Sequence, residues 1–477
     1  MLFTSLEFAI LVAVTFFLFY LVRGVALQVG ILLIASIIFY AISSPWLTSL
    51  LLSSAIFTSW TSHQIWTAKT ARKKRWVAAF GIVANLTVLA FFKYAGLLAE
   101  SFENLLGQSF SAAELIIMIP LPIGISFYTF QGISMLVDSF RESQNLESRV
   151  QSHQSKSTLQ KSIYHGVFFI IFFPQLVAGP VVKAKDFLPQ IVAKVASQIE
   201  WKFVFHSLVV GYFLKLVIAN NLQNQTFWIE FPYIVGMSAE RAWILLIGYS
   251  CQIFADFAGY SLIAIGIAAL FGYRLPQNFN FPYLSASIAE FWRRWHISLS
   301  SWLKDYLYIP LGGNRKGALW TYLNLLIVMT LGGLWHGAAW SYLIWGGYHG
   351  LLLAIERMTR LSSPKNKNLV DLGTLWMRFG IVFLLVSLGW SFFKLPYISH
   401  ASLFISQAFT AWEGRIVQKK EFIVVTLYCL PVFIYHLNSK IQLTRKVPQF
   451  IPVAYGVMIY AIVVNSSPAD AFIYFQF

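Results

Sequence analysis

Long apolar runs separated by short polar stretches make up most of this chain. Each run approaches the roughly 20 residues that an apolar helix needs to cross a bilayer. Some runs are short for a perpendicular crossing and one is long, so tilted or re-entrant pieces are expected. The pattern therefore predicts an all-α, polytopic membrane protein with about 11 to 13 membrane helices. We place the candidate spans at about 7–22, 25–42, 45–66, 76–98, 115–137, 162–180, 203–222, 241–271, 319–335, 338–356, 375–395, 422–437 and 450–466.

Proline and glycine interrupt this pattern at two of the spans. Pro120 and Pro122 precede a predicted helix over 120–141, where prolines near the first turn are tolerated because those N–H groups lack helical partners. Segment 173–180 reads Phe-Pro-Gln-Leu-Val-Ala-Gly-Pro, with helix breakers at both ends. It predicts a broken helix. Inside a membrane, a broken helix occurs only where its backbone packs against protein or lines a water-filled cavity.

The polar stretch 274–290 reads as a surface loop that leads into an amphipathic helix from about 285 to 302. We find no internal repeat, low-complexity tract or separate soluble domain in the sequence. The prediction is one membrane-embedded domain over 1–477, with its catalytic core at about 250–350.

Composition agrees with the membrane assignment. Of the 477 residues, 58% are hydrophobic and 11% charged, and the net charge is +16. We assign the excess Lys and Arg to cytoplasmic loops and anionic lipid head groups. Nucleic acid is not expected as a partner, because no basic-aromatic module stands clear of the apolar runs. Cys251 and Cys429 both lie in apolar segments and form neither a disulfide framework nor a metal motif.

The distribution of Lys and Arg predicts the orientation. A basic cluster occupies 69–75, the loop 99–114 carries acidic residues but no Lys or Arg, and 141–161 is basic again. If the basic segments are cytoplasmic, the N-terminus is extracytoplasmic. The first apolar run follows Glu7 and lacks a basic region before it, so we interpret it as a retained span, not as a signal peptide.

Segment 291–350 gathers the residues best suited to chemistry. His296 and His336 are 40 residues apart, too far for one helix face but compatible with two elements that meet in a cavity. A neutral imidazole at His336 could accept a proton from a hydroxyl and later return it. It could equally be a buried histidine that bonds a carbonyl between helices, where the small residues of Leu-Gly-Gly-Leu-Trp-His-Gly at 331–337 allow close approach.

Arg293 and Arg294 precede His296, and cations nearby favour its neutral form. They could hold phosphates of a ligand or contact lipid head groups. Asp256 is a lone acid in a long apolar span. It is either hydrogen-bonded to a neighbouring helix or part of the chemistry.

No metal site is predicted. His336 and His349 are 13 residues apart and no Cys or carboxylate accompanies them. A serine-hydrolase triad also lacks a nucleophile, because no Gly-x-Ser-x-Gly elbow occurs.

The segment 291–314 resembles the signature of the membrane-bound O-acyltransferase family. It begins Phe-Trp-Arg-Arg-Trp-His-Ile-Ser and ends Tyr-Ile-Pro-Leu-Gly-Gly-Asn. Leu-Trp-His-Gly at 334–337 is similar to the second family motif. More narrowly, the chain resembles the alginate O-acetyltransferase type of membrane subunit. Ala258 and Leu262 depart from its usual serine and aspartate. Further similar stretches are 173–180, 256–261, 275–280 and the terminal Phe475-Gln476-Phe477.

This resemblance implies a ring of tilted helices around a central tunnel and a multi-pass protein of the bacterial inner membrane. It implies His336 as the essential catalytic residue, acting either as a general base or as an acyl relay through a transient acyl-histidine. It implies His296 as a second, supporting residue. It also implies acetyl-CoA as the donor with no bound cofactor, an extracytoplasmic SGNH-type partner that receives the acetyl group, and a polysaccharide as final acceptor. Candidate donor- or substrate-binding residues are Arg293, Arg294, Trp295, Asp305, Tyr306, Asn314, Lys316, Trp335 and Gln175.

Two alternatives remain beside the O-acetyltransferase. One is a D-alanyl or other acyl transferase of the same family. The other is a transporter, which would be expected to show inverted repeats and paired broken helices in its two halves. The absence of such repeats and the clustering of candidate residues in 291–337 favour the enzyme.

Overall fold

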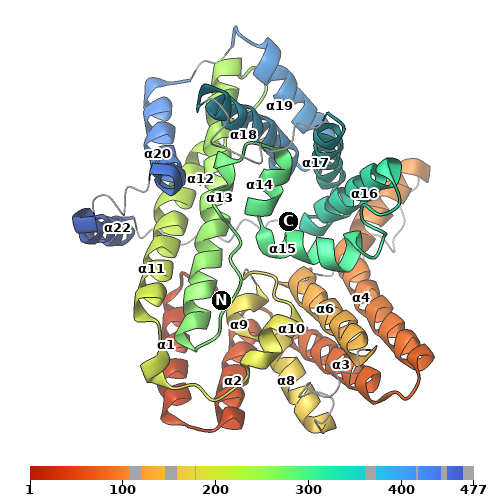
Figure 1. Ribbon diagram of the computed structural model, residues 1–477. Helices are drawn as coiled ribbons and strands as arrows, with labels where there is room; N and C mark the ends of the chain where they lie inside the picture. The colour runs from red at the N-terminus through yellow and green to blue at the C-terminus, as the bar shows by residue number, and fades with distance from the viewer. Residues whose placement is uncertain are drawn as a thin grey trace. The chain divides into compact units, whose positions relative to one another are not determined.

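The computed structural model describes residues 1–106, 120–144, 158–177, 179–359, 372–414, 417–441 and 448–465. Every regular element in these ranges is helical, so the predicted all-α class is confirmed (Figure 1). Some sequence predictions fall outside the described residues. These are Ala178, the terminal Phe475-Gln476-Phe477, and the segments 107–119, 145–157 and 360–371, the first of which includes the start of the predicted span 115–137.

Seven helical segments in the described ranges are long and apolar enough to cross a membrane. Two further apolar helices, Leu6–Leu21 and Pro448–Val464, are shorter. The other helices are shorter still or more polar, so the number of crossings stays a prediction. The seven segments are Val25–Ser43, Ala71–Glu103, Trp201–Thr226, Ala239–Leu270, Ala318–His336, Leu372–Lys394 and Lys419–Ser439.

The helices group into two compact units, so the single domain expected over 1–477 also stays a prediction. The first unit comprises Met1–His206 and Ala264–Pro276. Its helices are α1 (Leu6–Leu21), α2 (Val25–Ser43), α3 (Leu47–Thr67), α4 (Ala71–Leu106), α6 (Ile125–Gln144), α8 (Leu159–Ile171), α9 (Phe173–Leu176), α10 (Ala184–Phe187), and the 3₁₀ turns η1 (Leu188–Gln190) and η2 (Ala196–Gln198).

The broken helix predicted at 173–180 is present in the first unit. Helix α8 ends at Ile171, and α9 restarts with Pro174 in its first turn. The amide of Phe173 donates to the hydroxyl of Ser36 over 3.1 Å, and Phe173 is fully buried. The irregular backbone is therefore satisfied by protein, as required at membrane depth.

The second unit comprises Ser207–Ile263 and Gln277–Phe477. Two helices, α11 (Trp201–Tyr212) and α13 (Ala239–Leu270), have one end in each unit. The other elements are η3 (Phe213–Ala219, a π-helix), α12 (Asn220–Thr226), η4 (Pro282–Leu284), α14 (Ile288–Arg294), α15 (Ile297–Leu303), η5 (Lys304–Tyr308, a π-helix), α16 (Ala318–His336), α17 (Trp340–Met358), α18 (Leu372–Lys394), α19 (Ile398–Thr410), α20 (Lys419–Ile441), η7 (Pro448–Phe450) and α22 (Ile451–Val464).

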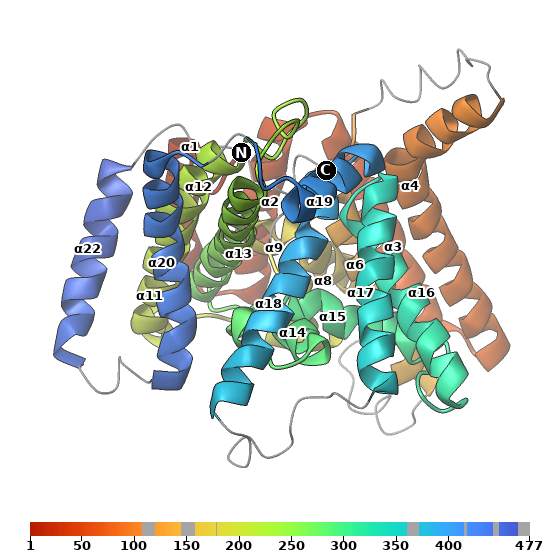
Figure 2. The same ribbon diagram turned by 90° about the horizontal axis from the view of Figure 1, so that it is seen from above.

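Helices α16 and α17 form a tight hairpin, and α17 also packs against α14 and α18 (Figure 2). Glycines allow the hairpin to close. A Cβ at Gly333 would lie 2.1 Å from the Tyr342 carbonyl oxygen, and one at Gly346 would lie 2.2 Å from that of Met329. Small residues at this interface therefore let the two backbones touch, as the sequence predicted.

The single amphipathic helix predicted over about 285–302 is wrong in one respect. The structure divides it into α14 and α15, with Trp295 and His296 between them. His296 has φ of +43°, a left-handed conformation in which an α-helix does not continue. The chain therefore turns at the histidine that the sequence singled out.

Candidate active site

Two buried histidines lie together in the second unit. The ring centres of His296 and His336 are 5.9 Å apart, and the ring planes meet at 55°. His296 is fully buried and His336 is 4% exposed. One stands at the junction of α14 and α15 and the other at the end of α16. The structure thus brings together two side chains that are 40 residues apart in the chain.

Asn278 holds the backbone that directly follows His296. Its carbonyl accepts from the Ile297 amide over 2.9 Å, and its Oδ1 accepts from the Ser298 hydroxyl over 2.6 Å. Its Nδ2 donates to the hydroxyl of Ser261 on α13, 2.9 Å away. A left-handed non-glycine residue costs free energy and persists only when its surroundings fix it. The buried Asn278 supplies that constraint.

The N-terminus of α14 is fixed by two carboxylates. The Ser287 hydroxyl accepts from the Glu290 amide over 3.0 Å, and Glu290 Oε2 accepts from the Ala286 amide over 3.0 Å. Glu356, from the far end of α17, accepts from the Ile288 amide over 2.5 Å. Acidic groups at a helix N-terminus are stabilising because the first amides lack helical partners. This anchoring ties the segment that leads into His296 to α17.

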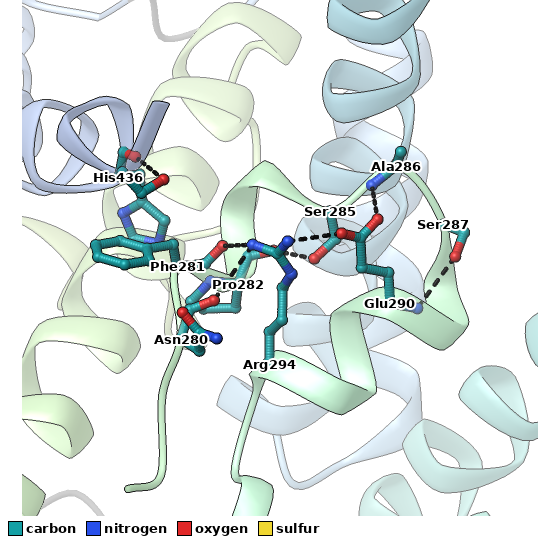
Figure 3. A network of polar contacts seen from close by, with 10 residues as sticks. Asn280, Phe281, Pro282, Ser285, Ala286, Ser287, Glu290, Arg294 and His436 are labelled. Atoms are coloured by element: carbon teal, nitrogen blue, oxygen red, sulfur yellow. Dashed lines mark hydrogen bonds and ion pairs between the residues drawn. The ribbon is translucent and has the colours of Figure 1, made fainter. Parts of the chain in front are cut away.

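Arg294 belongs to the same network. Its guanidinium donates to Glu290 over 2.7 Å and contacts the carbonyl oxygens of Asn280 and Phe281 at 3.4 Å (Figure 3). The side chain is 20% exposed. Arg294 therefore has a structural task in this structure, and its predicted role towards a donor phosphate stays a prediction.

Aromatic side chains enclose His336. Its ring centre lies 5.0 Å from Trp335, 5.1 Å from Trp345 and 5.3 Å from Phe393. Directly after it, a Cβ at Gly337 would lie 2.2 Å from the Tyr342 ring, so the turn into α17 needs a glycine there. The histidine is therefore held in an apolar cage at the tip of the α16–α17 hairpin.

His296 is also packed among aromatic rings, with Phe257 at 4.6 Å and Trp335 at 5.7 Å between ring centres. Neither of its ring nitrogens has a hydrogen-bond partner among the described residues. Burial lowers the pKa of His296 from its ordinary value near 6.5 to about 3. The ring is therefore neutral at physiological pH. The cause is desolvation and not, as the sequence suggested, the neighbouring arginines.

The remaining predicted residues differ in burial and in position. Trp295 is core, buried between Phe291 and Trp390. Asp305 and Tyr306 are half-buried on η5, and Trp335 is buried against both histidines. Gln175 belongs to the first unit, where it is fully buried and its Nε2 donates to the Phe169 carbonyl. The exposed residues are Arg293, Asn314 and Lys316, with Lys304 and Arg315 adding further exposed positive charge.

Several important residues were not assigned a role from the sequence. Lys215 on η3 pairs with Asp256 on α13 at 2.6 Å, and both side chains are at least 96% buried. This supports the reading of Asp256 as bonded to a neighbouring helix. A lysine inside an apolar span was the available signal, because such a charge needs a partner. Asn278 and Glu356 carry no comparable signal, since their contacts are tertiary. Glu290 instead contacts Ala286, Ser287 and Arg294 within the same stretch of chain.

The site suits proton transfer between neutral groups. A buried neutral imidazole can take a proton from a hydroxyl, and an apolar cage excludes the water that would compete with it. Among the described residues, no group of three or more His, Cys, Asp or Glu side chains could hold a metal ion.

Comparisons with known proteins identify the family of the chain. The model of the membrane-bound O-acyltransferase family matches residues 125–399. The chain is 37% identical over 403 residues to the "Probable alginate O-acetylase AlgI" of Pseudomonas aeruginosa, covering 83% of this chain and 72% of that protein. It is 35% identical over 385 residues to the "Peptidoglycan O-acetyltransferase" of Helicobacter pylori, covering 78% and 71%. The chain is also 30% identical over 191 residues to the "Teichoic acid D-alanyltransferase" of Bacillus subtilis. This shorter match covers 39% of this chain and 45% of that protein.

Fold and site thus define a multi-pass membrane enzyme that transfers acyl groups. The chain belongs to the membrane-bound O-acyltransferase family. The resemblance drawn from 291–314 and 334–337 is confirmed, and the transporter alternative is set aside.

Proposed function

We propose that this enzyme moves an acetyl group from acetyl-CoA, bound from the cytoplasm, through the membrane to an extracytoplasmic acceptor, for O-acetylation of an envelope or exported polysaccharide. The observation that carries the proposal is the pair of buried rings of His296 and His336, 5.9 Å apart in an aromatic cage. The alginate and peptidoglycan acetylation named for the relatives supports the substrate class. The inner membrane, the tunnel and an SGNH-type partner belong to the same proposal.

In the proposed reaction the acceptor oxygen attacks the thioester carbonyl carbon. His336 Nε2 or Nδ1 accepts the hydroxyl proton as the new C–O bond forms. The C–S bond then breaks, and the proton passes to the leaving thiolate. A thioester is already activated, so the protein must mainly orient it, move this proton and exclude water. General-base assistance of this kind is typically worth about 10² to 10⁴ in rate.

His296 supports this step in the proposal as a neutral neighbour of the reacting histidine. Exposed Arg293, Arg315 and Lys316 suit the donor's phosphates by charge. Lipid head groups would satisfy the same residues. Asp305, Tyr306 and Asn314 remain candidates for contact with the donor.

The deciding experiment measures transfer of radiolabelled acetyl from acetyl-CoA in membranes that carry the full chain, with and without the product of a neighbouring envelope gene. Oligomannuronate and muropeptide glycan fragments serve as acceptors. Wild-type membranes should transfer acetyl, and His336→Ala should lose at least about 100-fold in rate while the protein level in the membrane is unchanged. Full activity of His336→Ala would contradict the assignment.

A D-alanyl donor is the second candidate, favoured by the similarity to the teichoic acid enzyme. The same membranes are therefore offered a D-alanyl carrier-protein thioester. Transfer from this donor, with none from acetyl-CoA, would replace the proposed donor and leave the family chemistry in place.

A further inference from the structure

A third histidine lies close to the histidine pair and has no assigned role. His349 stands on α17, one helical turn after Trp345, and is fully buried. Its ring centre is 5.1 Å from Trp345 and 5.2 Å from Trp292. Trp345 in turn lies 5.1 Å from His336. One tryptophan ring thus separates His349 from the proposed catalytic histidine.

His349 and the two tryptophans next to it, Trp292 and Trp345, have side-chain nitrogens that make no hydrogen bond to the described residues. Neither ring nitrogen of His349 has a hydrogen-bond partner among the described residues, and the same holds for the indole N–H groups of Trp292 and Trp345. A buried polar group left without a partner costs about 1–3 kcal/mol, and native proteins satisfy nearly all of them. A histidine that served only as core packing would be expected to bond a nearby carbonyl. These three neighbouring side chains therefore have polar atoms available to a ligand that reaches His336.

The helix direction places His349 on one side of His336. Trp345, His349 and then Glu356 follow one another along α17. Glu356 binds the first amides of α14, the helix that bears exposed Arg293. One turn of helix advances about 6 Å over four residues. His349 itself contacts Trp345, whose ring lies against His336, and Trp292, the chain neighbour of exposed Arg293 in α14.

We propose that His349 is a donor-positioning residue, which hydrogen-bonds an amide of the pantetheine arm while the thioester reaches His336. This inference rests on the proposed function, because it needs a pantetheine thioester as donor. The first amide of such a donor is two carbons from the sulfur and offers both an N–H and a carbonyl. A neutral imidazole matches it, with one N–H and one accepting nitrogen. Trp345 and Trp292 add indole N–H donors and apolar faces. No bond is made or broken at His349.

The test is equilibrium binding of acetyl-CoA to the purified full chain in nanodiscs, measured by calorimetry. His349→Phe keeps the aromatic packing but removes both nitrogens. It should raise the Kd for acetyl-CoA about three- to tenfold, the range expected for one hydrogen bond. His349→Gln, which can still donate and accept, should recover part of the loss. Adenosine 3′,5′-bisphosphate, the nucleotide half of the donor without amides, should bind all three proteins equally.

A matched pair on α18 tests the same contact from the other side. A Cβ at Gly389 would lie 3.0 Å from His349 Nε2, whereas a Cβ at Gly380 would meet nothing within 4 Å. Gly389→Ala should therefore weaken acetyl-CoA binding and Gly380→Ala should not. If a thermal unfolding measurement shows that His349→Phe is not folded, the comparison of Gly389→Ala with Gly380→Ala tests the inference instead.

Unchanged acetyl-CoA binding in His349→Phe would overturn the inference and leave the proposed function standing. Equal weakening of acetyl-CoA and of the bisphosphate would also overturn it, because a structural defect affects both ligands. Wild-type protein that binds neither would remove the proposed donor, and this inference with it.

Discussion

At the scale of the residue, the site depends on groups that are costly to bury. His296 has a left-handed backbone and a fully buried ring. Asn278 holds the backbone through Ile297 and Ser298. The sequence indicated His296 through its motif, but neither the strain nor its constraint could be read from residue types. Both depend on the loop 275–280 returning to this helix junction.

The depressed pKa of His296 predicts a pH dependence of stability. Its pKa is about 3 in the folded protein and near 6.5 in an unfolded chain. Above pH 6.5 the His296 imidazole is neutral in both the folded and the unfolded protein, so the residue contributes no pH dependence of stability. As pH falls below 6.5, only the unfolded chain takes up the proton, so the folded state loses about 2 kcal/mol by pH 5. The apparent Tm in detergent should therefore fall between pH 6.5 and 5.

The variant His296→Phe isolates this effect, since other histidines titrate in the same range. It should show a smaller fall in Tm over that interval than the wild type. Equal slopes in the two proteins would show that His296 is not kept neutral by burial. His296→Ala, assayed at pH 7.5, should also reduce acetyl transfer severely, and unchanged kinetics would restrict the residue to a structural role.

The Lys215–Asp256 pair makes a second prediction at this scale. The two side chains are 2.6 Å apart and almost completely buried. Removing one partner of a buried pair leaves an uncompensated charge and typically costs about 3–5 kcal/mol. Asp256→Asn should therefore strongly lower the Tm and the amount of folded protein in the membrane.

The double variant Lys215→Met with Asp256→Asn is the control, because it removes both charges. It should recover a large part of the lost stability. If Asp256→Asn is as stable as the wild type, the pair is not a structural element, and a direct role of Asp256 in the reaction returns to consideration.

At the scale of the element, the α16–α17 hairpin places His336. The hairpin depends on glycines whose Cα atoms meet the backbone of the facing helix. The sequence predicted close approach around 331–337 correctly, because small residues permit it. It did not predict the break between α14 and α15. An amphipathic pattern continues through His296, and only the contact with Asn278 shows where the helix ends.

Two adjacent glycines on α17 test the hairpin. A Cβ at Gly346 would lie 2.2 Å from the Met329 carbonyl oxygen, whereas at Gly347 the nearest atom is Thr330 Oγ1 at 3.8 Å. Gly346→Ala should force the helices apart, cost about 1–3 kcal/mol or more and reduce transfer.

Gly347→Ala should be neutral or slightly stabilising, since alanine is the better helix former. Thermal unfolding and acetyl transfer, measured on Gly346→Ala and Gly347→Ala, test whether the hairpin is closed at Gly346. Similar behaviour of the two variants would mean that the hairpin is not closed at Gly346.

At the scale of the whole molecule, charge asymmetry predicts the orientation of the chain. The basic segment 69–75 is assigned to the cytoplasm. Within it, Lys73 is exposed, while Lys74 is buried and its Nζ donates to the Ser143 carbonyl over 2.6 Å. Of these two lysines, Lys73 is therefore the one suited to labelling. If the basic segment 183–202 is also cytoplasmic, the single candidate span Trp201–Thr226 that follows it predicts an extracytoplasmic position for the loop 227–238.

Single cysteines test this orientation in a chain whose buried Cys251 and Cys429 are replaced by alanine. A membrane-impermeant maleimide applied to intact cells should label Val235→Cys, whose native side chain is 48% exposed. It should not label Lys73→Cys until the cells are permeabilised. The reverse pattern would invert the topology.

The sequence by itself determined the class of this protein. Long apolar runs require helices that satisfy their own backbone groups, so the all-α membrane fold follows from hydrophobicity alone. The motifs at 291–314 and 334–337 determined the family, because their residues stand next to one another in the chain. Local patterns suffice for both conclusions.

Only the tertiary structure decided how the site is built. The approach of His296 to His336, the pairing of Asp256 with Lys215 and the contact of His349 with Trp292 all join residues far apart in the chain. Burial sets the protonation of His296, and burial is a property of the packed unit. No arrangement of neighbouring residue types encodes these contacts, because they depend on which helices pack together.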